Sequence, residues 1–444
     1  MLAASYFFYG WWDWRFLSLI AFSTVLDYFL GILIGGTEND KHRRYLLWIS
    51  LGANLGLLGF FKYYNFFIDS WISAWATAGI HMPDATLKII LPVGISFYTF
   101  QTLSYSLDIY KGRLEPTKDF ISFAAFVSFF PQLVAGPIER AINFLPQISN
   151  ARKFDLKQAS DGMRLMLWGM VKKILIADQL AVYVDGIFAN SETASSITLV
   201  LGAVYFTIQV YCDFSGYSDI AIGVAKLFGF ELMSNFRFPL FARSIPELWA
   251  RWHISLTTWL NDYVFGPISL RLRNLRRNGI ALAIVATFLV SGLWHGAEWS
   301  YVFWGLLNGL FFIPYVLKGQ IFNRQEIVAK GKMLPGIMDV LRILMVFSLF
   351  AFTMIFFRAK NMPEAIDYLS GIFTNFSGAI EYRSGLIYVF VLLFLEWINR
   401  EDERNPKILL MGPAGFRFSL QVILAIVLFF NMLNGYKEFI YFDF

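Results

Sequence analysis

Histidines are the side chains in this sequence best suited to proton transfer near neutral pH, and they fall into two contexts. His42 lies in a run of basic residues and His81 in a loop between hydrophobic segments, so both are expected to be solvated. His295 ends the apolar segment 280–295, where an ionisable side chain is costly unless it faces a cavity or a partner. We therefore expect acid–base chemistry to centre on His295.

The neighbours of His295 favour a site over a purely structural role. Gly292 and Gly296 bracket it and are expected to leave room for a ligand near the backbone, while Trp294 and Trp299 supply flat apolar walls. A neutral imidazole there can take a proton from a hydroxyl, as general-base catalysis of acyl transfer requires. A hydrogen-bonded structural histidine is the alternative for an arbitrary apolar span.

His253 lies in a segment that mixes tryptophans with charged residues. Glu247 and Arg251 are four apart and can pair on a helix, which leaves His253 on a different face. Positioning of substrate and plain interfacial packing both remain open for His253. A zinc site formed with His295 is the weaker idea, because no HExxH, HxH or cysteine ligand completes it; we expect neither a metal nor a bound cofactor.

Three stretches, 91–101, 129–140 and 211–219, are too polar and too rich in glycine and proline for lipid-facing helix. Taken singly, their charges fit helix packing with internal salt bridges, such as Asp213 or Asp219 with Arg237 or Arg243. Taken together, they indicate a water-accessible internal cavity. The residues predicted to line this passage are Ser96, Tyr98, Gln101, Asp213, Asn261 and Trp294.

Composition identifies the elements that must position these residues as membrane helices. The chain is 57% hydrophobic and 16% charged, whereas soluble proteins carry about 25% charged residues. A bilayer is crossed by roughly 20 apolar residues in a helix. The predicted spans are 14–35, 45–67, 88–108, 118–136, 160–185, 195–212, 214–230, 280–295, 299–317, 338–358, 384–398 and 417–434.

Basic loops predict the orientation of these spans. By the positive-inside rule the loops 41–44, 271–277 and 318–332 are cytoplasmic, so the turn 296–298 points into or across the membrane. The region 231–278 is expected to lie at the interface or to re-enter the bilayer. Basic residues cluster at loops and form no stripe suited to nucleic acid. We expect one membrane domain over residues 1–444.

Five motifs in order resemble the membrane-bound O-acyltransferase family, in particular the bacterial branch that contains the alginate O-acetylation protein. They are PVGISFYTF at 92–100, PQLVAGPI at 131–138, DFSGYSD at 213–219, RWHISL at 251–256 and GLWHG at 292–296. The resemblance places His295 at the family's essential histidine and His253 at the second histidine of this branch. Relatives carry a further hydrophobic segment before the equivalent of Ala4, so an N-terminal helix is expected to be missing here.

The resemblance implies a fold and an activity. The fold is a ring of about 11 to 13 transmembrane and re-entrant helices around a central tunnel, in the inner membrane of a bacterium. The activity is transfer of an acetyl group from a cytoplasmic thioester, with acetyl-CoA as the expected donor, for O-acetylation of an extracytoplasmic polysaccharide such as alginate. The acceptor is the sugar itself or a partner protein resembling an SGNH esterase.

Two rival functions remain open from the sequence. A transporter or channel would use the same polar intramembrane stretches as its pathway, although no internal repeat is visible. A scaffold that only anchors an exopolysaccharide complex would not need His295. Covalent transfer of the acyl group, tested with and without this histidine, separates the three functions.

Overall fold

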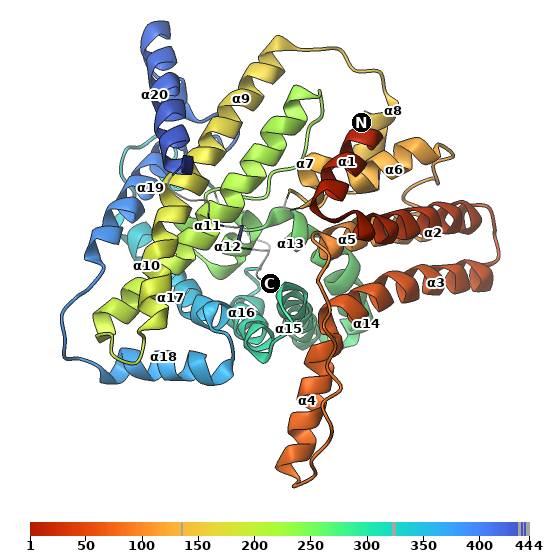
Figure 1. The fold of residues 1–444 in the computed structure, drawn as a ribbon, viewed down its shortest axis with the longest axis horizontal. Coiled ribbons are helices and arrows are strands. Elements are labelled where there is room, and N and C mark those ends of the chain that lie inside the picture. The colour runs from red at the N-terminus through yellow and green to blue at the C-terminus, as the bar shows by residue number, and fades with distance from the viewer. Residues whose placement is uncertain (135, 322–325, 434–436, 438, 441–444) are drawn as a thin grey trace. The chain divides into compact units, whose positions relative to one another are not determined.

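The computed structural model describes residues 1–134, 136–321, 326–433, 437 and 439–440, and over these residues the chain is helical and contains no strand. Ala135, within the second motif, and part of the basic loop 318–332 lie outside the described residues, as does the last residue of the span 417–434. The chain forms two compact units, Met1–Phe154 and Asp155–Phe444 (Figure 1). The single domain expected from sequence stays a prediction.

Among the described residues, seven helical stretches are long and apolar enough to cross a membrane, which confirms the prediction of an all-α, multi-pass membrane protein. Tertiary packing buries them unequally, since 72% of the apolar window in the central stretch is buried inside the chain, against 6% in the last. The stretches are Leu2–Gly35, Asp40–Thr77, Ser196–Leu227, Arg273–His295, Trp299–Lys318, Ile337–Arg358 and Ala414–Leu433.

Unit 1 is built around a buried carboxylate. Its helices are α1 (Leu2–Asp13), α2 (Leu17–Gly35), α3 (Asp40–Leu58), α4 (Tyr64–Thr77), α5 (Ile95–Tyr110), α6 (Phe120–Ser128), α7 (Phe130–Leu133) and α8 (Ala141–Ser149). Asp27 on α2 accepts hydrogen bonds from Ser50 (2.5 Å) and Asn54 (2.7 Å) on α3, and from Ser106 (2.7 Å) on α5. A buried polar group is tolerated when it is fully hydrogen-bonded, so these contacts hold three helices in register.

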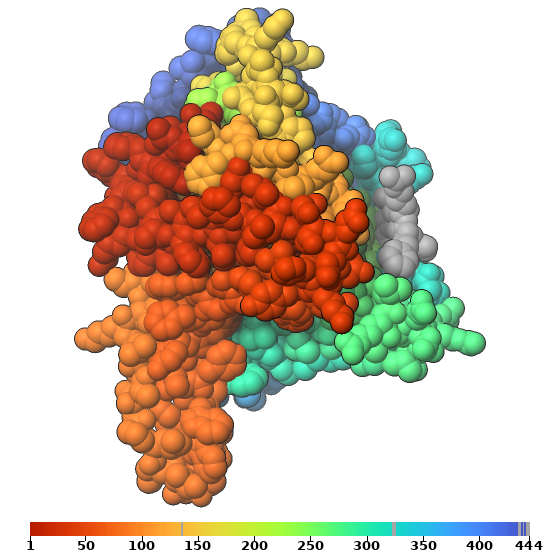
Figure 2. All heavy atoms as spheres, turned by 90° about the vertical axis from the view of Figure 1, so that its right-hand side faces the viewer, coloured from red at the N-terminus to blue at the C-terminus, as the bar shows by residue number. Residues whose placement is uncertain are grey.

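An arm extends from the rest of unit 1. The π-helical segment Gly59–Tyr63 separates α3 from α4, and α4 with the returning chain projects outward in both views (Figures 1 and 2). The predicted span 88–108 is helical only from Ile95, because Gly94 before it adopts a left-handed conformation (φ 75°) with its Cα facing the carbonyl of Leu133.

Unit 2 contains the longer helices. They are α9 (Leu156–Met170), α10 (Asp178–Ala189), α11 (Ser196–Leu227), α12 (Ile245–Arg251), α13 (Ile254–Leu260), α14 (Gly266–Arg271), α15 (Arg276–His295), α16 (Trp299–Lys318), α17 (Ile337–Arg358), α18 (Met362–Thr374), α19 (Leu386–Asn399) and α20 (Ala414–Leu433). The π-helical segment Val171–Ala177 joins α9 to α10 and turns both Lys172 and Lys173 into the interior. Local π-helix often marks functional positions.

The predicted spans 195–212 and 214–230 are wrong as two elements, because α11 runs unbroken from Ser196 to Leu227 across the boundary between them. A Cβ on Gly216 would lie 2.6 Å from the carbonyl oxygen of Gly169, and one on Gly169 would lie 2.5 Å from that of Gly216. These glycines therefore allow α9 and α11 to approach closely, as small residues do between membrane helices. They do not end the helix.

The salt bridges proposed from sequence are also wrong in their partners. Asp213 pairs with Lys173 (2.6 Å) and Asp219 with Lys172 (2.7 Å). The arginines Arg237 and Arg243 pair instead with Glu403 (3.1 Å) and Glu247 (3.5 Å). Lys172 and Lys173 lie in the segment Val171–Ala177, which packs beside α11 and belongs to the predicted apolar span 160–185. Both arginines lie in the chain that follows α11.

Candidate functional site

His295 is the last residue of α15 and its side chain is buried among aromatic rings. Its ring centroid lies 4.9 Å from that of Trp294, 5.1 Å from that of Trp304 and 5.1 Å from that of Phe357. All three contacts are edge-on, with interplanar angles of 71° to 84°. In this packing the His295 side chain is largely shielded from solvent.

Both glycines beside His295 allow close packing on Tyr301, and Gly296 also lines a cavity, so the room that they were expected to leave for a ligand stays a prediction. A Cβ on Gly292 would lie 2.3 Å from the carbonyl oxygen of Tyr301, and one on Gly296 would lie 2.1 Å from the Tyr301 ring. Trp299 is 55% exposed, so it is not a wall of the buried site. Trp304, one turn and a half further along α16, is buried and contacts His295 instead.

His253 lies in the same cluster, with its ring centroid 6.4 Å from that of His295 and 5.8 Å from that of Trp294. It precedes α13 with a left-handed backbone (φ 44°), which costs a residue with a Cβ about 1–3 kcal/mol and is found mainly where tertiary structure enforces it. The predicted pairing of Glu247 with Arg251 is confirmed at 2.6 Å.

Asn235 holds the backbone of the His253 turn, and the sequence analysis did not single it out. Its backbone carbonyl oxygen accepts from Ile254 N–H (2.8 Å), and its side-chain oxygen accepts from the Ser255 hydroxyl (2.6 Å). The same side chain donates to the Ser218 hydroxyl on α11 (3.0 Å). Asn235 thus ties the strained turn to the longest helix of unit 2.

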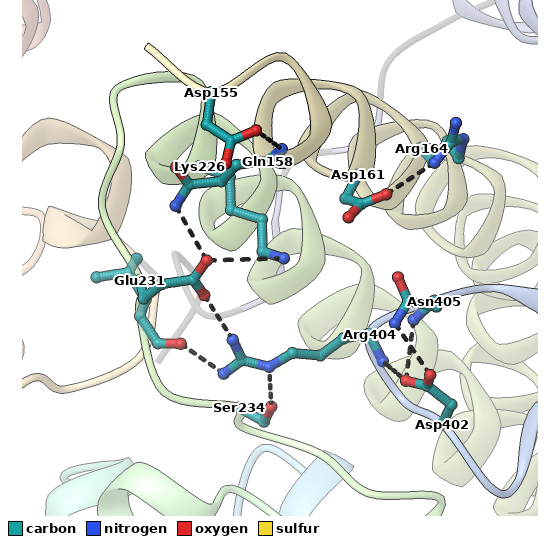
Figure 3. A network of polar contacts seen from close by, with 11 residues as sticks. Asp155, Gln158, Asp161, Arg164, Lys226, Glu231, Ser234, Asp402, Arg404 and Asn405 are labelled. Carbon is teal, nitrogen blue, oxygen red and sulfur yellow. Dashed lines mark hydrogen bonds and ion pairs between the residues drawn. The ribbon is translucent and has the colours of Figure 1, made fainter. Parts of the chain in front are cut away.

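Arg404 in turn holds the segment that carries Asn235 (Figure 3). Its guanidinium donates to the Ser234 hydroxyl (3.1 Å), the Glu231 carboxylate (2.9 Å) and the Leu232 carbonyl (2.6 Å). Glu231 also accepts from Gln158 at the start of α9 (3.0 Å). Two segments far apart in the sequence, which carry Gln158 and Arg404, therefore converge on the chain that leads to His253.

A polar cavity of about 510 Å³ begins at the residue after His295. It is lined by both charge signs: the cations are Lys173, Arg358, Lys360 and Lys437, and the carboxylates are Asp178, Asp185, Asp213 and Glu298. Tyr301 also lines it and packs on Phe357 (5.0 Å), which contacts His295. We refer to it as the polar cavity.

The inner part of the polar cavity is fixed by a buried ion triplet. Lys173 lies 2.6 Å from a carboxylate oxygen of Asp213 and 2.8 Å from one of Asp178. Asp213 also accepts from the backbone N–H of Ile440 (2.8 Å). The one sequence signal for Lys173 is that it is a lysine inside an apolar span. Ionisable residues in membrane spans are rare, so this signal could have identified it as a candidate.

An apolar cavity of about 270 Å³ begins one helical turn before His295, at Ser291. No charged side chain lines it among the described residues, and its polar groups are Thr257, Thr258, Asn261, Thr287 and Ser291. Trp249 lines it and packs on Trp304 (5.8 Å), which contacts His295. We refer to it as the apolar cavity. Along α15, His295 therefore lies between two cavities of opposite character.

The structure distributes the remaining predicted site residues between these features. Asp213 lines the polar cavity and Asn261 the apolar cavity, while Trp294 contacts both histidines. Ser96, Tyr98 and Gln101 lie on α5 in unit 1, so their place in a passage with His295 stays a prediction. In the part of the chain that the structure describes, no group of three His, Cys, Asp or Glu side chains could hold a metal ion.

The fold and the site define a class: a helical, multi-pass membrane protein with a buried histidine between a polar and an apolar cavity. Residues 114–359 match the model of MBOAT, the membrane-bound O-acyltransferase family. The chain belongs to this family, as the sequence motifs predicted.

Its curated relatives carry names that refer to alginate, peptidoglycan or teichoic acid. A "Probable alginate O-acetylase" from Pseudomonas putida is 41% identical over 70% of this chain and 63% of its own length. A "Peptidoglycan O-acetyltransferase" from Helicobacter pylori is 34% identical over 84% of this chain and 73% of its own length. A "Teichoic acid D-alanyltransferase" from Streptococcus thermophilus is 27% identical over 57% of this chain and 64% of its own length. The chain thus spans less than two thirds of the first of these relatives.

Proposed function

We propose that this chain is an O-acyltransferase that moves an acetyl group from a cytoplasmic thioester to a hydroxyl on the extracytoplasmic side, with His295 as the general base. The observation that carries the proposal is the place of His295 between the two cavities. An acyl chain is apolar and a sugar hydroxyl is polar, so each reactant has a cavity of matching character.

In the proposed reaction the acceptor hydroxyl attacks the carbonyl carbon of the thioester. His295 takes the hydroxyl proton as the new C–O bond forms, the C–S bond breaks, and the proton passes to the departing thiolate. A positioned general base contributes about 10²- to 10⁴-fold to such a step. His253, held by Asn235 within the same aromatic cluster, would position the reacting groups.

The names of the relatives support a cell-surface polymer as the final acceptor, with alginate as the expected example and acetyl-CoA as the expected donor. The acceptor at the polar cavity is the polysaccharide or a partner protein of the SGNH-esterase type. We place the protein in the bacterial inner membrane, with the loops 271–277 and 318–332 in the cytoplasm.

The test is acetyl transfer from radiolabelled acetyl-CoA in proteoliposomes that also carry the acceptor. His295→Ala should lower the rate at least 100-fold, with protein amount and thermal stability matched. His81→Ala, which removes an exposed loop histidine, is the matched control and should leave the rate unchanged. Full activity of the His295→Ala protein would refute the assignment.

A polar and an apolar cavity on either side of the aromatic cluster around His295 also suit a transport pathway. Uptake of substrate into vesicles without covalent transfer of label would favour a transporter. If transfer persists in His295→Ala but is lost on truncation, the chain acts as a scaffold.

A further inference from the structure

A groove between α16 and α17 lies apart from both cavities. It has a volume of about 310 Å³ and its walls belong to two candidate membrane spans. The lining residues are Ile245, Leu310, Phe311, Pro314, Tyr315, Lys318, Met345 and Leu349. We refer to it as the α16–α17 groove.

The groove is open to the surroundings and has an apolar floor. Leu310 is 41% exposed and Met345 50% exposed, whereas Ile245, which begins α12, is 2% exposed. From Leu310 to Lys318 the wall on α16 extends about 12 Å at 1.5 Å per residue.

Cations gather at one end of the groove. Lys318 at the end of α16 lines it, and Arg277 lies beside Lys318, donating to the Leu317 carbonyl (2.6 Å). On α17, Arg342 precedes the lining residue Met345 by three positions, which places both on one face. Because α16 ends where α17 begins, Lys318 and Arg342 flank the same end.

These cations have little carboxylate around them. Among the described residues, no ion pair involves Lys318 or Arg277, and Arg342 meets only Asp339, at 3.9 Å. Asp339 is shared with Arg243 (3.8 Å). The end of the groove is therefore positively charged, and the rest of it is apolar.

We propose that the α16–α17 groove binds a phospholipid with an anionic headgroup, with the headgroup at Lys318 and Arg342 and an acyl chain along Leu310 and Met345. Basic pockets between membrane helices attract anionic headgroups, and the long cationic side chains extend to the interface. The lipid would contact Ile245 at the start of α12, and the other end of α12 leads to His253. The proposal does not depend on acyl transfer.

The test uses delipidated full-length protein in detergent, with its melting temperature measured as lipid is added. Phosphatidylglycerol should raise the melting temperature, and phosphatidylethanolamine with the same acyl chains should not. Native mass spectrometry should show one retained phosphatidylglycerol. The variant Lys318→Gln/Arg342→Gln should weaken the apparent affinity at least ten-fold, and Leu310→Trp should do the same by filling the groove.

The matched control is Arg271→Gln/Arg273→Gln, which removes two exposed cations from the segment before α15. An equal loss of affinity in this control would overturn the proposal in favour of general electrostatic attraction. Equal stabilisation by the two lipids, or by inorganic phosphate alone, would also overturn it. Should the charge variant fail to fold, the headgroup comparison on unchanged protein and Leu310→Trp still decide.

Discussion

The polar and apolar cavities, whose lining residues Gly296 and Ser291 lie on either side of His295 in the sequence, differ in the interactions that shape them. The polar cavity is lined by four cations and four carboxylates, of which Lys173 and Asp213 are buried and paired with each other. The apolar cavity is shaped by side-chain packing and five uncharged polar groups. Because an unpaired buried charge costs more than an unpaired uncharged group, removing one buried charge from the polar cavity should lower the free energy of unfolding more than removing one polar group from the apolar cavity.

The largest expected effect follows from breaking the ion triplet in the polar cavity. Lys173→Met leaves Asp213 and Asp178 without their shared cation, which should lower the free energy of unfolding by about 3–5 kcal/mol. Thermal unfolding in detergent measures it. Lys360→Met, at an exposed lysine of the same cavity, is the control and should be near neutral. Equal melting temperatures would show that the triplet does not stabilise the cavity.

A smaller effect is expected from narrowing the apolar cavity. Thr287→Phe adds bulk where the proposed function places the donor, so donor binding should weaken by about 1.4 kcal/mol. The KM for acetyl-CoA should rise about ten-fold, because 1.4 kcal/mol is a factor of ten, with the KM for the acceptor unchanged. Leu282→Phe, at an exposed site on the same helix, should change neither value. A change in the acceptor KM alone would exchange the roles of the two cavities.

The reverse experiment addresses the polar cavity. Glu298→Gln removes a charge two residues from Gly296, and should raise the KM for the acceptor about five-fold, as expected for roughly 1 kcal/mol. The KM for the donor should stay constant. Glu381→Gln, at an exposed loop carboxylate, provides the comparison. A shift in the donor KM would count against separate cavities.

The smallest effect is expected at the exposed rim of the polar cavity. Asp185 pairs with Arg358 (3.1 Å) and Lys437 (2.8 Å), and its own side chain is 50% exposed. Solvent-exposed pairs contribute about 0–1 kcal/mol, so Asp185→Asn should lower stability by less than 1 kcal/mol. High salt should abolish the difference from the unchanged protein. A salt-independent loss comparable to that of Lys173→Met would remove the distinction between rim and interior.

Much of the site could be predicted where the signal is local. Glu247 and Arg251 pair because they are four apart on a helix, and His295 stood out because an imidazole is rare at the end of an apolar span. Lys173 and Asn235 were missed for the opposite reason. Asp213 is 40 residues from Lys173 and Ser218 is 17 residues from Asn235, and the π-helical segment that turns Lys173 inward has no sequence signature.

The sequence alone was enough to predict the membrane environment, the all-helical class and the family. Hydropathy, side-chain chemistry and ordered motifs are properties of short segments. The tertiary structure alone decided which charges pair, why Gly216 and Gly292 are glycines, and that a polar and an apolar cavity lie on either side of His295. These features depend on which helices meet and in what register. Close packing between distant segments sets that register.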